Sequence, residues 1–129
     1  MSSWNSFEDI DIWKLARVLT EDIYNLFKNT PLGKDFALRD QMNRSSGSIM
    51  DNIAEGFGRE GNKEFIHFLT YSKGSCLELK SQLYRCFDRN YISKTDFELY
   101  KQKTTEIDNK IGGLIAYLKK SSYKGLKYK

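Results

Sequence analysis

The sequence predicts an all-α protein, an antiparallel, up-down-up-down four-helix bundle. Four stretches repeat apolar residues at steps of three and four, the spacing that places them on one face of an α-helix. No stretch alternates apolar and polar residues with the period of two that a half-buried strand requires. Short breaks containing Gly, Pro, Asn or Ser separate the four stretches, and short connections favour antiparallel neighbours.

The first predicted helix spans about residues 8–28. Ser6 and Asp9 precede its apolar face in an S-x-x-D pattern, which is typical of a capping box. The break at residues 29–33 ends the helix because it combines Pro and Gly. The apolar face consists of Ile12, Ala16, Leu19, Ile23 and Leu26.

The second predicted helix spans about residues 36–57, with Asp35 as its N-cap. Gly56, Gly58 and Gly61 mark its end, because glycine permits the left-handed turn that closes many helices. Its apolar side consists of Leu38, Met42, Ile49, Met50, Ile53 and Phe57, with Ser46 among them.

The third helix is expected to begin at an Asn62 cap and to reach about residue 89. Its apolar face consists of Phe65, Leu69, Ser72, Cys76, Leu79, Leu83 and Cys86. Ser93 and Asp96 form a second S-x-x-D pattern before the fourth helix, which ends near residue 120. A heptad seam predicts that this helix packs in a bundle; it consists of Phe97, Tyr100, Thr104, Ile107, Ile111, Leu114 and Leu118.

Composition narrows the class of protein. A chain of 129 residues with 40% apolar residues suits one domain with a real core, which we place at residues 1–120. No run of 18 apolar residues and no basic, apolar leader occurs, so we expect a cytoplasmic protein without a membrane span. Cys76 and Cys86 on one helix would lie about 15 Å apart, too far for a disulfide. With His67 as the single histidine, neither a metal nor another cofactor is expected.

The net charge of +4 is concentrated at one end of the sequence. Residues 119–129 contain five lysines and no acid, so the remaining residues sum to −1. Lysines neutralise phosphates, and Tyr123 and Tyr128 can stack on unpaired bases; a solvated terminus explains the same residues equally well. We expect residues 121–129 to be a flexible basic tail. The lysines are Lys119, Lys120, Lys124, Lys127 and Lys129.

A stripe of polar residues runs along the second helix at spacings of four, four and three, so its members stack one turn apart. The stripe consists of Arg44, Ser48, Asn52 and Glu55. Three interpretations are open. The stripe can form a network within the chain that reaches Glu78, or it can meet the Ser75–Glu78 side of a neighbouring subunit. It can also contact a ligand or nucleic acid directly.

Two further features carry weaker predictions. Arg59 and Lys63 flank the glycine turn, where a helix N-terminus can hold phosphate, although a capped turn accounts for the same residues. The Gly-rich pattern follows a helix rather than a strand, so it is no dinucleotide fingerprint. An enzyme is not expected, because His67 stands alone and the serines of the third helix have no evident base.

Several motifs together resemble one known family. They are Phe7-Glu8-Asp9 with Trp13 and Ala16, Leu38-x-x-Gln41-x-x-Arg44, Ser48-Ile49, Asn52-Ile53-Ala54-Glu55-Gly56-x-Gly58-Arg59, Glu64-Phe65 and Gly74-Ser75-x-x-Glu78-Leu79. This set resembles the bacterial four-helix-bundle family, also called the S23 ribosomal protein family or the 23S rRNA intervening-sequence proteins. The resemblance covers about residues 7–118. Asn43 departs from it, since a second basic residue is expected beside Arg44.

The resemblance implies a protein associated with intervening sequences of 23S rRNA, a homopentameric assembly and a poorly defined role. The accessory variability proteins of diversity-generating retroelements are similar in fold; they are basic pentamers that bind a reverse transcriptase and nucleic acid. We therefore expect a non-catalytic, RNA-binding homo-oligomer without a small-molecule substrate, contacting RNA through Arg59 and the tail lysines. The alternative is a protein-interaction scaffold for a reverse transcriptase or a ribosome-maturation partner.

The aromatic residues support the expectation of self-association. Aromatic residues make up 14% of the chain, more than the core of a small bundle readily buries. We expect some of them to line a subunit interface. The candidates are Trp4, Phe7, Trp13, Phe36, Phe57 and Tyr117.

Overall fold

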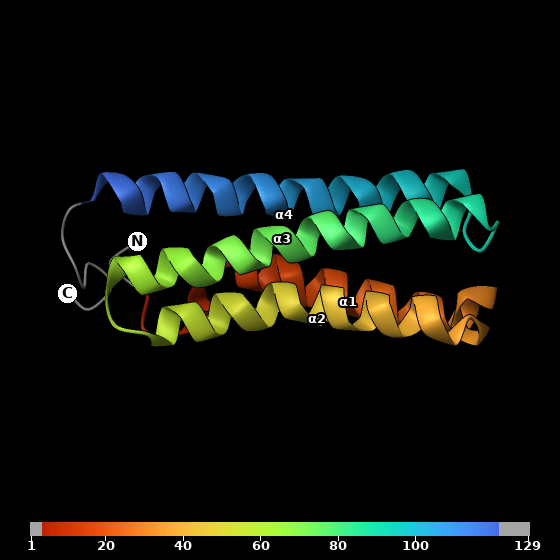
Figure 1. Cartoon of the computed structure of the whole chain (residues 1–129), viewed down its shortest axis with the longest axis horizontal. Helices are drawn as coiled ribbons and strands as arrows, with labels where there is room; N and C mark the ends of the chain where they lie inside the picture. Colours follow the sequence, from red (N-terminus) through yellow and green to blue (C-terminus); the bar gives the residue numbers. More distant parts are fainter. Residues whose placement is uncertain (1–3, 122–129) are drawn as a thin grey trace.

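The computed structural model describes residues 4–121, and within this range the chain is helical and contains no β-strand. Neighbouring helices run antiparallel, up-down-up-down, which confirms the predicted fold class (Figure 1). Two short 3-10 turns accompany the four helices. The elements are η1 (Phe7–Asp9), α1 (Asp11–Asn29), η2 (Pro31–Lys34), α2 (Phe36–Gly58), α3 (Gly61–Asp88) and α4 (Lys94–Lys120).

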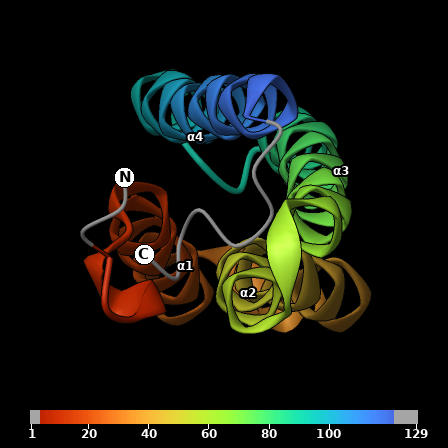
Figure 2. The ribbon, with the colours of Figure 1, turned by 90° about the vertical axis from the view of Figure 1, so that its left-hand side faces the viewer.

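The four helices follow one another around the bundle, so that α1 lies across from α3 and α2 across from α4 (Figure 2). The seam between α2 and α3 is the most extensive, and the α3–α4 and α1–α2 seams come next. The seam between α1 and α4 is the least extensive of the four. The bundle therefore has three well-packed seams and a fourth, between α1 and α4, at which the helices pack less extensively.

The predicted apolar faces of α1 and α3 are buried throughout. The buried face of α2 differs from the predicted one: Met50 and Phe57 are only half-buried, while Ser45 and Gly56 are buried. Gly56 explains part of this difference. A Cβ built on it would lie 2.6 Å from Phe68 Cβ, so α2 and α3 can approach this closely only where a side chain is missing.

Two predicted helix caps are confirmed. The Asp35 carboxylate accepts a hydrogen bond from the backbone N–H of Leu38 at 3.3 Å. The Ser93 hydroxyl accepts one from the backbone N–H of Asp96 at 3.1 Å. Both satisfy N–H groups that the first turn of a helix leaves without a partner.

The predicted Asn62 cap is wrong. Gly61 has a φ of +80°, which turns the chain so that α3 begins one residue before Asn62. Asn62 is buried within the first turn of α3, and its amide Nδ2 donates a hydrogen bond to the carbonyl oxygen of Leu118 at 3.4 Å. The predicted capping box of Ser6 and Asp9 is confirmed, but it caps the short η1, so α1 begins at Asp11 rather than near residue 8.

No helix among residues 4–121 is long and apolar enough to span a lipid bilayer. Most of the predicted tail, including Lys124, Lys127 and Lys129, lies outside the described residues.

Candidate functional site

The polar stripe of α2 borders a depression on the surface of the α2–α3 seam. We call it the α2–α3 hollow. Antiparallel packing places the small and polar residues of α2 beside the Gly74–Ser75 step of α3, where the absence of large side chains leaves room. The stripe residues Ser48 and Asn52 therefore share one site with Ser75 and Glu78. The hollow is lined by Ser48, Asn52, Thr70, Tyr71, Gly74, Ser75 and Glu78.

Some polar groups that line the hollow form hydrogen bonds within the described chain, and others form none. Asn52 Nδ2 donates to the carbonyl oxygen and to the hydroxyl of Ser48, both at 2.9 Å, which orients the Asn52 amide. Within the described chain, Asn52 Oδ1 receives no hydrogen bond, the Ser75 hydroxyl makes none, and Glu78 forms no ion pair. The hollow therefore offers several unused acceptors and one net negative charge.

The two ends of the predicted stripe do not join this site. Glu55 forms an ion pair with Arg59 one turn further along α2, with Glu55 Oε2 2.8 Å from Arg59 Nη2. Arg59 also lies 5.0 Å from the centre of the Phe68 ring. Arg44 is exposed and makes no hydrogen bond or ion pair within residues 4–121. In place of one connected network, the stripe forms a local Asn52–Ser48 contact and a local Glu55–Arg59 pair, because Asn52 and Glu55 each find a partner one turn away.

Two buried hydrogen bonds join α2 to α3, and the sequence pattern predicts neither of them. The Ser45 hydroxyl donates to Gln82 Oε1 at 2.6 Å, and both side chains are buried. The Ser72 hydroxyl, fully buried, donates to the carbonyl oxygen of Ile49 at 2.9 Å. Ser45 directly precedes Ser46, which the apolar spacing places on the buried side of α2. A slightly wider buried face on α2 would therefore have included Ser45.

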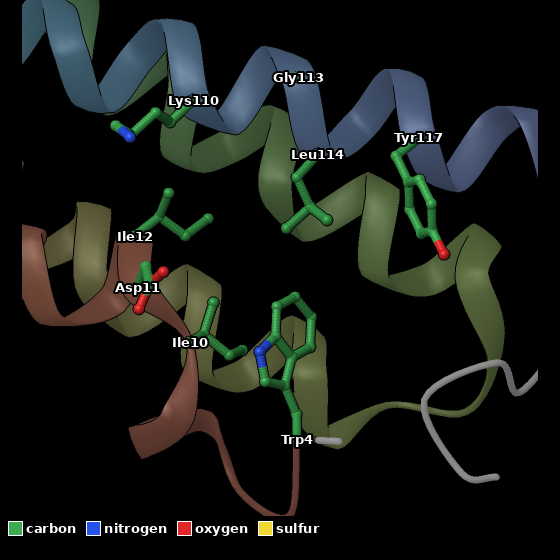
Figure 3. Close-up of a pocket in the computed structure, with 8 residues that line it drawn as sticks. All are labelled: Trp4, Ile10, Asp11, Ile12, Lys110, Gly113, Leu114 and Tyr117. Carbon is green, nitrogen blue, oxygen red and sulfur yellow. The ribbon is translucent and has the colours of Figure 1, made fainter. Parts of the chain in front are cut away.

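A second, apolar depression lies on the loose α1–α4 seam (Figure 3). Trp4, Ile10 and Ile12 approach it from the N-terminal segment and α1, while Leu114 and Tyr117 approach from α4. Asp11, Lys110 and Gly113 complete its lining.

The predicted interface aromatics divide into two groups. Trp4, Phe7, Trp13 and Phe57 pack partly against the core, with the Phe7 and Trp13 rings 5.0 Å apart in an edge-on contact. Phe36 is 62% exposed and Tyr117 is 42% exposed, so these two remain available for contact with another molecule. The assignment of aromatics to a subunit interface stays a prediction.

The predicted RNA-binding cations that are described gather at one end of the bundle. Lys119 and Lys120 are exposed in the last turn of α4. Arg59 is the C-cap of α2, and the C-terminal ends of α2 and α4 point to the same end of the molecule (Figure 1). Because Arg59 is paired with Glu55, its charge is partly neutralised there.

The nucleophilic and metal-binding residue types form no assembled centre in the described chain. Burial raises the pKa of the free thiols of Cys76 and Cys86 to about 12, so both are protonated at neutral pH. His67 is exposed, and its ring lies 4.6 Å from that of Tyr71. Among residues 4–121 no three His, Cys, Asp or Glu side chains are placed to hold a metal ion.

Fold and surface together define a class, a small antiparallel four-helix bundle with a polar hollow on its most extensive seam and exposed cations at one end. The chain belongs to the family of 23S rRNA-intervening sequence proteins, whose pattern it matches over residues 8–113. It is similar to the crystal structure of a protein of unknown function from the S23 ribosomal protein family of Bacteroides thetaiotaomicron VPI-5482. The two share 25% sequence identity and a TM-score of 0.76, over 81% of this chain and 97% of the other. Among curated proteins, none matches the chain.

Proposed function

We propose that this protein is a non-catalytic, self-associating helical scaffold that binds RNA, with 23S rRNA intervening sequences as its context. The family membership supplies that context. The observation that carries RNA binding is the partition of charge: residues 119–129 hold five lysines and no acid, while the rest of the chain sums to −1. A local excess of cations attracts phosphate irrespective of base sequence.

Two of these five lysines, Lys119 and Lys120, lie within the described residues, in the last turn of α4. Because α4 ends at Lys120, both Lys119 and Lys120 project from the helix end at which the remaining lysines of the chain begin. Arg59 lies at the same end but shares its charge with Glu55, so we assign it a smaller contribution than the lysines.

Self-association would multiply this contact. Each copy contributes the same cationic end, and several such ends on one assembly bind a long polyanion with an avidity that exceeds the affinity of a single copy. Exposed apolar side chains support self-association, since Phe36 and Leu77 are 62% and 57% exposed. A homopentamer is the assembly that the family resemblance favours.

The test compares two double variants in an RNA-binding titration against salt concentration. Lys119→Gln/Lys120→Gln should weaken binding and lower the slope of log K against log salt by about 1.4, at about 0.7 for each lost contact with a single strand. Lys34→Gln/Lys94→Gln is the matched control, because it removes two exposed lysines from the opposite end of the bundle. Equal slopes for both variants and the natural chain would refute the cationic end as the RNA contact.

A protein-interaction scaffold for a reverse transcriptase or a ribosome-maturation partner is the second candidate. The incompletely bonded α2–α3 hollow favours it, because such groups suit a protein side chain better than a phosphate. Capture of partners from a lysate, with and without nuclease, separates the two candidates. Partners lost with the RNA favour RNA binding, and protein partners that persist favour the scaffold.

A further inference from the structure

The apolar depression between α1 and α4 has the size and lining of a small-molecule site. We call it the α1–α4 groove. Its walls come from Trp4, Ile10 and Ile12 on one side and from Leu114 and Tyr117 on the other, and it has a volume of about 360 Å³. Small-molecule sites measure about 300–1,000 Å³ and are lined mainly by apolar and aromatic side chains. The α1–α4 groove meets both criteria.

Two aromatic side chains border the apolar part of the groove. Trp4 is half-buried, and its ring meets the Phe57 ring edge-on with the ring centres 6.1 Å apart, which fixes Trp4 beside the groove. Tyr117 is 42% exposed on the opposite wall (Figure 3). Aromatic rings pack favourably edge-on or offset against one another. The apolar part therefore suits a ligand group that is itself an aromatic ring.

The other part of the groove carries one charge of each sign. Asp11 and Lys110 are the charged residues among the described residues that line it, and both lie on the side away from Tyr117 (Figure 3). Both side chains are exposed, and neither forms an ion pair or a hydrogen bond within residues 4–121. A carboxylate and an ammonium are thus available to a ligand beside the apolar walls.

The charges around this part of the groove sum to zero. Along the two helices, exposed Lys14 lies one turn beyond Asp11, and exposed Glu106 lies one turn before Lys110, so the neighbours add one charge of each sign. A ligand with a single charge is attracted by one of the lining groups and repelled by the other, whereas a ligand with both charges is attracted by both. Charge complementarity therefore selects a zwitterion.

We propose that the α1–α4 groove binds a free α-amino acid with an aromatic side chain. Such a molecule carries its ammonium and its carboxylate on one carbon, so both charges sit at one end. Asp11 accepts hydrogen bonds from the ammonium, Lys110 donates to the carboxylate, and the ring packs between Trp4 and Leu114. A residue within a peptide lacks at least one of the two charges, so the free amino acid is the better match. This site shares no residue with the RNA contact proposed above.

Three probes of similar size test the recognition of both charges by the natural, full-length chain. At neutral pH L-phenylalanine carries both charges, phenethylamine carries only the ammonium, and 3-phenylpropanoate carries only the carboxylate. Isothermal titration calorimetry should show at least about tenfold tighter binding of phenylalanine than of either analogue, because each analogue leaves one charged side chain without its hydrogen bond. Equal affinities for the three probes would overturn the amino-acid assignment, and so would a lack of phenylalanine binding at millimolar concentration.

Substitutions assign each charge of the ligand to its partner. Asp11→Asn should remove the advantage of phenylalanine over 3-phenylpropanoate, and Lys110→Gln should remove its advantage over phenethylamine. Glu106→Gln and Lys14→Gln are the matched controls, because each removes one exposed charge of the same sign outside the groove, and both should keep the tenfold preference. If Asp11→Asn and Lys110→Gln also keep it, the pairing with these two side chains is overturned.

The two tryptophans of the chain report where the ligand binds. Trp4 lines the groove, whereas Trp13 lies outside it and packs against Phe7. Phenylalanine should therefore shift the indole N–H NMR signal of Trp4 and leave that of Trp13 in place. A larger shift at Trp13 would overturn the site. The RNA titration changes lysines outside the groove, so the failure of either proposal is distinguishable from the failure of the other.

Discussion

The close approach of α2 and α3 at Gly56 predicts that Gly56→Ala does not stabilise the protein, whereas helix propensity alone predicts that it does. Replacing glycine by alanine inside a helix normally stabilises it by up to about 1 kcal/mol. At Gly56 the added Cβ would lie 2.6 Å from Phe68 Cβ and 3.1 Å from Phe65 Cδ1. Phe68 Cβ is fixed to the backbone of α3, so the helices must separate to admit the methyl group.

The size of the effect follows from these two opposing terms. Overpacking of this kind costs about 1–3 kcal/mol, which offsets the propensity gain. Gly47→Ala is the matched control, since it lies in the middle of the same helix and its new Cβ would meet nothing within 4 Å. We therefore expect Gly47→Ala to be more stable than Gly56→Ala by about 1–3 kcal/mol.

Urea unfolding followed by circular dichroism measures this difference. Equal stabilities, or a more stable Gly56→Ala variant, would refute the reasoning, because they would mean that α2 and α3 do not meet as closely at Gly56 as the structure shows. A shift in the midpoint without a change in the m-value would show that the variants differ in stability and expose the same surface on unfolding.

Two further predictions concern titration. Hydrogen bonds from Tyr91 and from the Leu38 backbone hold the pKa of Asp35 below its usual value, and Arg89 adds to this. A depressed carboxyl pKa contributes stability above the unfolded-state pKa of about 4 that is lost as pH falls through the folded-state pKa. Melting temperatures between pH 2.5 and 7 should therefore decline less below pH 4 in Asp35→Asn than in the natural chain, and parallel profiles would contradict this. The pKa of about 12 for Cys76 and Cys86 predicts negligible reaction of the folded protein with a disulfide reagent at pH 8, with two thiols titrating once urea unfolds it. Rapid labelling of either thiol in the folded state would show that burial is incomplete.

The helices could be predicted because their signals are local. Apolar spacing placed α1 and α4 on the correct faces, and the Asp35 and Ser93 caps were identified from residue type and position. The Asn62 cap failed for a reason that residue type does not reveal: Gly61 adopts a positive φ and starts α3 one residue early.

The sequence by itself determined the number of helices, their faces, their antiparallel order and the charge imbalance, because each depends on residues close together along the chain. Only the tertiary structure decided that Ser48 and Asn52 share a hollow with Ser75 and Glu78. That meeting depends on the rotation and register of α2 against α3, which are set by close packing at Gly56 and by the buried Ser45–Gln82 contact. The same packing left Arg44 outside the site, since small differences in helix rotation decide which flank of a polar stripe reaches the neighbouring helix.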